Sequence, residues 1–502
     1  MNSKKLYKSY QKNKDNFHKY IDDIRKRAKV DIYTIINATL IKNPYVSEFS
    51  KKFFLDDFNK KNKFILFLKS SLKLYLKQLY MFFSYLISFL LFKIFYKKDK
   101  KQYKNFIYID ICFLVNNIIR DSKFNENYFN GLYDILDKYN KSYVYIPRLY
   151  GVNKNPFKLI KFFKIINQDD RRFLFEFELI SLKDFIHILY MTAIYPFKTL
   201  RLIQKEKKNE DILFNNELIK DIGNLSFDAF SRYIFGENIA RLSNINKIYS
   251  WSEFQVIERS FNYGIKTLNS KIKLYGCQFY LNYETYFNSY VDEIDFKQRT
   301  SYDEVLVNGL YYLQEKDFVK YKNGVSLRYK NIFEFDDIIE YKNILLLGSY
   351  IESDTKYMLK IVSSFNRILF KNHPAVSINK FGNLNSNIVV VNDNIYKLFE
   401  NTSIVIGTAS GTSLEAVACG VSVIIIASQD NLTANPLLKY GQAKIWDIAF
   451  TKDDVKRLYN NLIKYRQNNI DEIKSIASWY KDNLFIEPTE ENIVNAFELD
   501  KE

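Results

Sequence analysis

The run SIVIGTASGTSLEAVACGVSVIII, residues 403–426, constrains the fold of this chain more than any other segment. An apolar strand ends at Gly407, a turn of small hydroxyl residues follows, and a helix begins at once. Gly420 ends that helix, and a second apolar strand starts at Val421. Two short buried strands joined by a helix pair in parallel, so this run predicts a doubly wound α/β domain.

The same alternation of strand and helix continues on both sides of this run. At 502 residues the chain is long enough for two or three domains. We therefore predict an α/β protein with two Rossmann-like domains and a helical, basic N-terminal extension. The expected strands are 106–114, 142–147, 271–276, 303–308, 343–347, 367–370, 387–391, 403–406 and 421–426, and the clearest helices are 127–139, 354–365, 395–400 and 412–419.

Changes of pattern divide the chain into four predicted parts. They are a basic helical segment (1–104), an N-terminal Rossmann-like acceptor domain (105–330), a C-terminal Rossmann-like nucleotide-sugar donor domain (331–455) and C-terminal helices that pack back on the domains (456–502).

The net positive charge of the chain lies in the first of these parts. Residues 1–105 account for the whole formal charge of +17, and the rest of the chain is formally neutral. The same part holds the most apolar stretch, Phe64–Tyr96, in which Lys69, Lys73 and Lys77 recur at helical spacing. We expect residues 60–105 to contact an anionic membrane surface, and we expect no nucleic-acid partner.

Three placements of the apolar stretch stay open. It can lie in a membrane interface, cross the bilayer, or form a buried helical hairpin. The uncharged run Gln78–Phe92 is shorter than the roughly 20 residues that a span needs, although counting on to Tyr96 makes a span feasible. The first residues lack the pattern of a signal peptide, and Cys112, Cys277 and Cys419 lack metal or disulfide spacing. We expect a cytoplasmic protein, peripheral at the inner face of the cell membrane.

The turn after residue 406 has the composition of a phosphate-binding site. Its backbone N–H groups lie at the start of a helix, where an anion is favoured, and its hydroxyls add further donors. Glu415, in the first helical turn, can accept from a ribose hydroxyl or simply complement the helix dipole. The candidate ligands are Gly407, Ser410, Gly411, Thr412, Ser413 and Glu415.

A second polar cluster follows the predicted strand 367–370. In FKNHPAV (370–376), Lys371, His373 and Pro374 come where the strands of a parallel sheet face a ligand crevice. His373 can donate to a phosphate or to a departing nucleotide oxygen. Gly348 and Ser349 follow strand 343–347 and are expected at the same edge.

These two motifs resemble the donor domain of glycosyltransferases with the B fold. "KNHP" followed by "GTASGTSLEAVACGVSVI" is similar to a bacterial surface-polysaccharide group of sialyltransferase-like, Kdo-transferase-like and CDP-glycerol-polymerase-like enzymes, over roughly residues 245–450. In its CMP-donor members a His-Pro pair and a Ser/Thr-rich turn bind the nucleotide phosphate. The resemblance implies that role for His373-Pro374 and for Ser410, Thr412 and Ser413.

An upstream pattern is similar to surface carbohydrate biosynthesis proteins of the same group. YSWSEFQVIERSF (249–261) and IKLYGCQFY (272–280) match "W-x-E…E-R…G-x-Q-H", except that Phe279 stands in the place of the histidine. An inverting transfer needs a carboxylate to take the acceptor's proton. Glu258 is the first candidate for the catalytic base, with Glu253 and Asp110 as alternatives.

The sequence therefore predicts a glycosyltransferase of bacterial surface polysaccharide (capsule or lipopolysaccharide) biosynthesis. It would transfer a CMP-activated acid sugar, sialic acid-like or Kdo-like, to a lipid-linked or oligosaccharide acceptor with inversion. No Asp-x-Asp motif is present to hold a metal, and we expect no cofactor besides the nucleotide sugar. The alternatives are a CDP-polyol phosphotransferase or UDP-sugar epimerase of the same fold, and a non-catalytic membrane-bound assembly protein.

Overall fold

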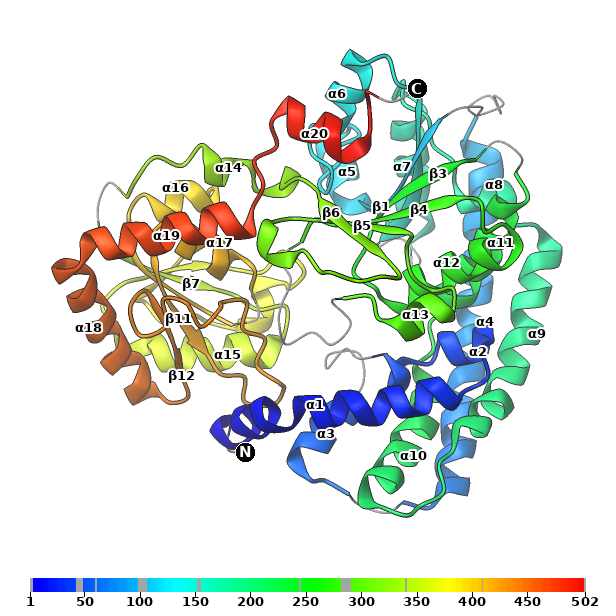
Figure 1. Cartoon of the computed structure of the whole chain (residues 1–502), viewed down its shortest axis with the longest axis horizontal. Coiled ribbons are helices and arrows are strands. Elements are labelled where there is room, and N and C mark those ends of the chain that lie inside the picture. The colour runs from blue at the N-terminus through cyan, green and yellow to red at the C-terminus, as the bar shows by residue number, and fades with distance from the viewer. Residues whose placement is uncertain are drawn as a thin grey trace.

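Two six-stranded parallel sheets with flanking helices form the body of the protein, as the computed structural model shows (Figure 1). The structure describes residues 3–41, 48–58, 61–97, 106–150, 155–242, 245–280, 290–338, 341–408 and 410–500. The basic cluster 98–104 of the predicted membrane segment lies outside these residues. The predicted fold class, two Rossmann-like domains with a helical N-terminal region, is confirmed by this architecture.

The first sheet has the strand order β2-β1-β3-β4-β5-β6. The connection from β2 to β3 is long and holds five helices, α7 to α11. The strands are β1 (Ile107–Leu114), β2 (Tyr143–Tyr150), β3 (Lys247–Trp251), β4 (Lys273–Gln278), β5 (Glu304–Val307) and β6 (Lys320–Asn323). The helices are α5 (Val115–Asp121), α6 (Leu132–Lys138), α7 (Pro156–Ile166), α8 (Glu176–Leu179), α9 (Leu182–Thr199), α10 (Asn209–Asp221), α11 (Phe227–Ala240), α12 (Val256–Leu268), α13 (Glu293–Lys297) and α14 (Lys330–Phe333).

The second sheet has the order β12-β11-β10-β7-β8-β9, which is the Rossmann order of two mononucleotide-binding halves. Its strands are β7 (Asn343–Leu347), β8 (Ile368–Lys371), β9 (Ile388–Val390), β10 (Thr402–Gly407), β11 (Ser422–Ile426) and β12 (Trp446–Ala449). Its helices are α15 (Glu352–Ile361), α16 (Ile395–Phe399), α17 (Thr412–Ala418), α18 (Lys452–Asn468) and α19 (Ile470–Leu484).

Hydrophobic runs specify the central strands of both sheets. In β10, Ile404, Val405 and Ile406 are all fully buried, as expected for a parallel strand covered on both faces. Strands β3, β6 and β12 were not predicted. They are short and carry lysine or aspartate, so neither an apolar run nor an alternation marks them.

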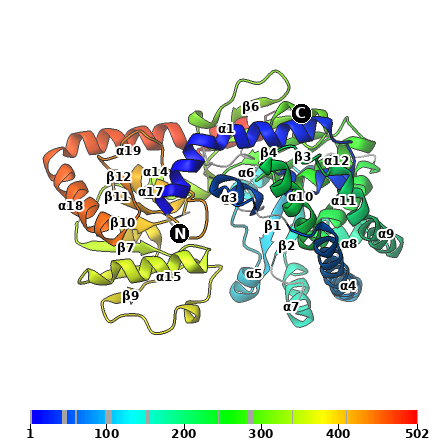
Figure 2. The ribbon, with the colours of Figure 1, turned by 90° about the horizontal axis from the view of Figure 1, so that it is seen from below.

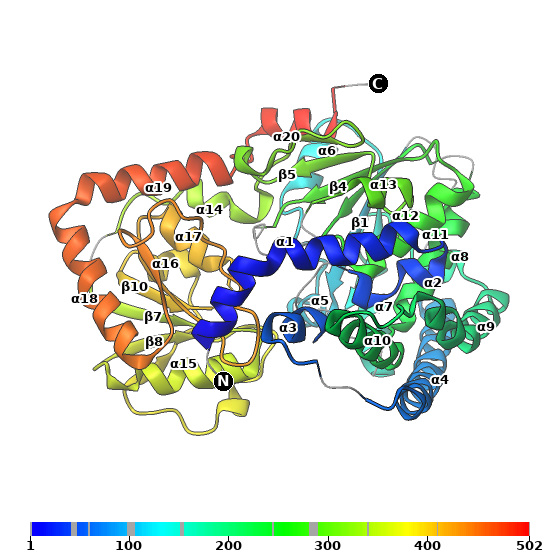
Figure 3. The same ribbon diagram turned by 60° about the horizontal axis from the view of Figure 1, so that its bottom comes forward.

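The N-terminal helices are α1 (Ser3–Arg27), α2 (Ile32–Ile35), α3 (Glu48–Leu55) and α4 (Lys63–Phe95). Helix α1 lies across both domains, as Figure 3 shows. Near its start, the Tyr7 ring packs 5.6 Å from that of Phe450, which follows β12. Near its end, Arg25 is buried and pairs with Asp292 (2.6 Å) and Asp295 of the first domain. Helix α1 therefore ties the two domains together.

The C-terminal end of the chain forms a second tie. After α19 on the second domain, α20 (Glu490–Phe497) returns to the first domain and packs on α6 (Figure 1). Tyr249 on β3 donates a hydrogen bond to the carbonyl of Phe497 (2.9 Å), and Tyr139 donates to Glu490 (3.0 Å).

We predict that Arg25→Ala lowers the free energy of unfolding by about 3–5 kcal/mol, because it leaves buried carboxylates without their cation. The exposed Arg27 is the matched control, and Arg27→Ala should cost less than about 1 kcal/mol. Urea unfolding followed by tryptophan fluorescence measures both. Equal stability of the two variants would show that the contact between α1 and the first domain contributes little.

Candidate nucleotide-binding site

The candidate donor site lies where β7, β8 and β10 end side by side. In the register of the sheet, Leu347 pairs with Lys371 and Leu346 with Ile406, so the three loops that follow start at one edge. The chain order reverses between β7 and β10, which is the switch point where open parallel sheets bind ligands. The structure thus brings the loops of Gly348, His373 and Ser410–Ser413 to one edge.

The turn after β10 presents donors that the protein itself does not use. The hydroxyls of Thr408 and Ser413 are buried, and neither has a hydrogen-bond partner in the described structure. The backbone N–H groups of Ser410, Gly411 and Thr412 also make no hydrogen bond with the described residues. An unsatisfied buried hydroxyl costs about 1–3 kcal/mol. A bound anion or ordered water would remove that cost.

His373 is held as a neutral donor. Its Nδ1 accepts a hydrogen bond from the N–H of Ala375 (3.1 Å), so the proton of the neutral ring belongs on Nε2. Desolvation lowers the pKa of His373, which favours this neutral form near pH 7. Within the described residues Nε2 has no partner. His373 can therefore donate to a phosphate oxygen without carrying a charge.

Gly348 sets the position of the His373 loop. A Cβ at residue 348 would lie 2.9 Å from the N atom of His373 and 3.1 Å from Oδ1 of Asn372. Any side chain would push the loop away from the sheet edge. Gly348 is therefore required for close approach, and no direct ligand contact is needed to explain it.

Two predicted ligands already have protein partners. The hydroxyl of Ser349 accepts from the N–H of Ile351 (3.0 Å), and its backbone is bonded to Thr355. Lys371 donates to the carbonyl of Asp393 (2.6 Å). We assign both a positioning role in the loops after β7 and β8. Pro374 is exposed in the turn after β8. A Cβ at residue 407 would meet Leu347 and the Ser413 hydroxyl at 3.4 and 3.5 Å, which are ordinary contact distances.

Glu415 connects the donor site to the first domain. It accepts a hydrogen bond from Tyr396 (2.5 Å). Burial raises the pKa of Glu415, while the bond from Tyr396 and the charge of Arg328 oppose that rise. The Arg328 guanidinium lies 5.3 Å from the ring of Tyr128 and 5.6 Å from that of Trp251, at the end of β3. Arg328 therefore stands between the two domains.

Arg328 is a candidate site residue that the sequence does not reveal. Its side chain is exposed, and among the described residues it makes no hydrogen bond or ion pair. An arginine held over aromatic rings with its donors unused suits a phosphate. No motif marks it, because it lies in the polar segment that links the domains.

The predicted base Glu258 is bound on both oxygens. One accepts from Arg148 (2.6 Å) and the other from the N–H of Gln255 (2.8 Å) at the start of α12. The side chain is also buried, so an acceptor hydroxyl would have to displace one of these partners. The alternative Asp110 is fully buried and bonded to Arg232 (2.8 Å). Both carboxylates hold the fold of the first domain.

Glu253 is better placed to act as a base. It is exposed just beyond β3 and accepts from the indole N–H of Trp251 (3.2 Å). It also lies close enough to affect the pKa of Arg328, so it faces the space between the domains. Of Glu258, Asp110 and Glu253, Glu253 alone is exposed.

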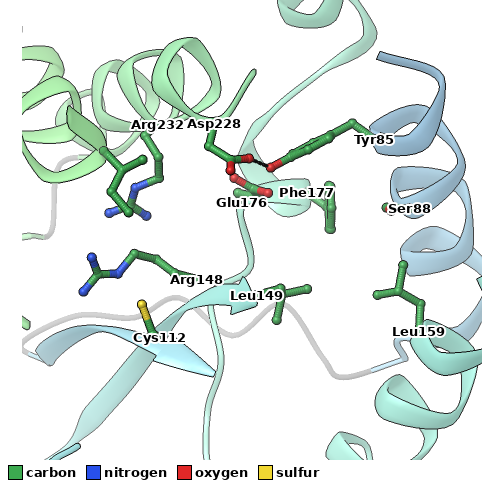
Figure 4. A pocket seen from close by; sticks show the side chains of 11 residues that line it. Tyr85, Ser88, Cys112, Arg148, Leu149, Leu159, Glu176, Phe177, Asp228 and Arg232 are labelled. Atoms are coloured by element: carbon green, nitrogen blue, oxygen red, sulfur yellow. Dashed lines mark hydrogen bonds between the residues drawn. The ribbon is translucent and has the colours of Figure 1, made fainter. Parts of the chain in front are cut away.

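A cavity of about 90 Å³ lies under α4 in the first domain (Figure 4). Asp228 and Glu176 lie together on one side of it, and Arg148 and Arg232 lie on the other. Tyr85 of α4 donates to Asp228. Burial raises the pKa of Asp228 to about 6 and also raises that of Glu176. The cavity has room for only a few waters, so we assign these groups to the core of the domain.

Phe279, which replaces the histidine of the upstream pattern, is a core residue. Its ring is fully buried and packs 5.7 Å from Phe129 and 6.1 Å from Phe497. The ring lies in the contact between the first sheet and α20. The phenylalanine that replaces the histidine of the pattern therefore contributes to the packing of the core.

One acidic group could in principle hold a metal ion. Ligand atoms of His18, Asp22 and Asp292 lie within 4.8 Å of one another. Arg25 already pairs with Asp22 (3.1 Å) and Asp292 (2.6 Å), which accounts for the gathering of carboxylates.

No family model and no curated protein matches the sequence. Solved structures with a similar fold include the UDP-GlcNAc 2-epimerase from Neisseria meningitidis bound to UDP-GlcNAc (9% identity, TM-score 0.39, covering 78% of this chain and 99% of that one). Another is the calicheamicin glycosyltransferase CalG4 (7% identity, TM-score 0.41, covering 80% of this chain and 98% of that one). A third is the wall teichoic acid polymerase TagF (12% identity, TM-score 0.36, covering 87% of this chain and 97% of that one). Similarities this low do not decide the activity of this chain.

We predict that Asp228→Asn stabilises the protein above pH 6. Folding raises the pKa of Asp228 from 3.8 to about 6. The folded state therefore holds this proton more tightly, and the free energy of unfolding falls as pH rises from about 4 to 6. Asparagine cannot ionise, so the variant avoids this loss. Its free energy of unfolding should exceed that of wild type by roughly 1–3 kcal/mol at pH 8.

Chemical unfolding between pH 4 and 8 measures the effect, with Asp134→Asn, an exposed position on α6, as control. A parallel pH profile for wild type and Asp228→Asn would mean that folding does not raise the pKa of Asp228.

Proposed function

We propose that this protein is an inverting glycosyltransferase that transfers a CMP-activated acid sugar, sialic acid-like or Kdo-like, to a lipid-linked glycan. The reaction would serve bacterial surface polysaccharide biosynthesis at the inner face of the cell membrane. The observation that supports it best is the set of unused donors at the switch point of the second sheet. They are the hydroxyls of Thr408 and Ser413 and the backbone N–H groups of Ser410, Gly411 and Thr412.

These donors suit the phosphate of a nucleotide sugar. Each N–H or O–H can donate to a phosphate oxygen, and such bonds strengthen as negative charge grows on the leaving nucleotide. His373 adds a neutral donor through Nε2, and Arg328 adds a positive charge from the side of the first domain. Glu415 is left to bind a ribose hydroxyl beside Tyr396. The choice of CMP rests on the resemblance of the His-Pro pair and the hydroxyl-rich turn.

The transfer breaks the bond between the anomeric carbon and the phosphate oxygen, and CMP departs with the electron pair. The acceptor oxygen forms the new bond to that carbon from the opposite face. Its proton passes to Glu253, the exposed carboxylate at the end of β3. Glu258 acts through Arg148, which donates to the carbonyl of Trp251 (2.6 Å) and so fixes the end of that strand.

Charge stabilisation in this scheme comes from the protein's own groups. Arg328 and the donors of the turn take the part that a divalent cation plays elsewhere, so we propose transfer without a metal. A CDP-polyol phosphotransferase and a UDP-sugar epimerase would use the same edge and differ in the nucleotide bound. A non-catalytic assembly protein would have no need of these unused donors.

We predict that calorimetric titration shows binding of CMP in preference to CDP and UDP. Ser413→Ala and His373→Ala should each weaken CMP binding by roughly 10- to 100-fold, because each removes a hydrogen bond to a charged group. Ser377→Ala, an exposed serine four residues beyond His373, is the matched control and should bind CMP like wild type.

Binding of UDP but not CMP would overturn the donor assignment. CMP binding that survives both substitutions would overturn the site. A chain that binds none of the three nucleotides would support the non-catalytic alternative.

A further inference from the structure

Helix α4 buries several polar side chains against the protein and leaves many large apolar side chains exposed to the solvent. Its buried positions are Ser70, Ser71, Leu74, Gln78, Tyr85, Ser88 and Phe92, most of them polar. Exposed along the rest of the helix are Phe64, Ile65, Leu68, Leu72, Leu76, Leu79, Tyr80, Phe83, Ile87, Leu90 and Ile94. This distribution is the reverse of that of a helix on a water-soluble domain.

The polar face of α4 is bound along its length to the first domain. Gln78 donates to the carbonyl of Leu225 (2.8 Å), and Tyr85 donates to Asp228 on α11. Lys73 donates to the side-chain oxygen of Asn224 (2.8 Å), and Lys77 donates to the carbonyl of the same residue (3.1 Å). Helix α4 therefore lies flat on the domain and does not project from it.

Helix α9 extends the same apolar surface. It runs antiparallel to α4, because Phe67 packs on Phe197 at one end while Phe89 packs on Phe185 at the other. Its own exposed stripe recurs at helical spacing and consists of Leu182, Ile186, Tyr190 and Phe197. Figures 1 and 2 place α4 and α9 at the edge of the first domain that is farthest from the second domain.

The charge around this surface fits an anionic lipid layer. Helix α4 contains lysine but no acidic residue, and the same is true of the adjoining α7. Lys69 on α4 and Lys183 on α9 are exposed and make no ion pair among the described residues. Lysines beside an apolar face are attracted by anionic headgroups at about 1 kcal/mol each.

We propose that α4 and α9 form one membrane-docking surface that lies in the plane of a single leaflet of an anionic bilayer. Of the described helices, α4 is the one long and apolar enough to cross a membrane, and only 22% of its most apolar window is buried, so it is not a core helix. A crossing would strip Gln78 and Tyr85 from their partners along the polar face. At 33 residues the helix is about 50 Å long, more than a span of roughly 30 Å requires.

This orientation goes beyond the proposed reaction. The first domain, with Glu253, would rest on the bilayer that carries a lipid-linked acceptor. The second domain, with the nucleotide site, would stand away from it in the aqueous phase (Figure 1). The docking surface does not depend on which nucleotide is bound.

The test is co-sedimentation of the full chain with phosphatidylcholine vesicles, with and without phosphatidylglycerol. We expect binding to the anionic vesicles that weakens in high salt. The double variant Leu76→Glu/Ile186→Glu changes side chains that are 62% and 65% exposed, so it should fold normally. It should lower vesicle partitioning by at least roughly 100-fold, because two apolar side chains no longer enter the leaflet.

Leu268→Glu, an exposed leucine at the end of α12, is the matched control and should bind vesicles like wild type. Circular dichroism and nucleotide titration check the fold of every variant. Wild-type binding by the double variant would overturn the proposal. So would a dimer in lipid-free buffer that the double variant abolishes while no form of the chain binds vesicles, because a second copy would then cover the surface.

A second measurement separates docking in the plane from spanning. Lys61→Cys and Lys97→Cys place thiols at exposed positions next to the two ends of α4. In sealed inside-out vesicles from expressing cells, a membrane-impermeant maleimide should label both, above the background of the unsubstituted chain. Labelling of one position only after permeabilisation would show a span and overturn the in-plane arrangement.

Discussion

The buried side chain of Arg148 is the interaction on which the first domain depends. It extends from β2 to Glu258 on α12, to Asp110 on β1 and to the carbonyl of Trp251 on β3. A buried guanidinium is tolerated only when such partners surround it, and removal of any one leaves an uncompensated charge. The ends of three neighbouring strands are therefore fixed relative to one another. This cluster also positions Trp251 and Glu253, which lie at the end of β3.

The second domain differs, because polar groups at the carboxyl edge of its sheet have no partner among the described residues. Tight contacts such as that between Gly348 and His373 fix the loops, while Thr408 and Ser413 keep their hydroxyls unused. Helix α1 and the return of the chain from α19 to α20 tie the two domains together, and the charge of Arg328 acts on Glu415 across them. In the proposed reaction, the edge of the first domain that carries Glu253 and the turn of Ser410–Ser413 would hold the acceptor and the donor.

The sequence predicted the parts of this structure that local pattern determines. Strand β7 was placed at its observed bounds, and the turn of Ser410–Ser413 was recognised because a strand, small hydroxyl residues and a helix adjoin in the chain. Contacts between residues far apart in the chain could not be predicted from the sequence. Glu258 looked like a free helical carboxylate because Arg148 is 110 residues away, and Arg328 sits in a segment without pattern. The apolar stretch was visible, but its polar, protein-facing side appears only when α11 and Leu225 are in place.

The central claim is that the carboxyl edge of the second sheet binds the phosphate of a cytidine nucleotide. A crystal structure of the full chain with CMP tests it most directly. The account predicts a phosphate within hydrogen-bond distance of the Ser413 hydroxyl, the N–H groups of Gly411 and Thr412 and Nε2 of His373. CMP bound away from this turn, or with its phosphate in contact with none of these groups, would contradict it.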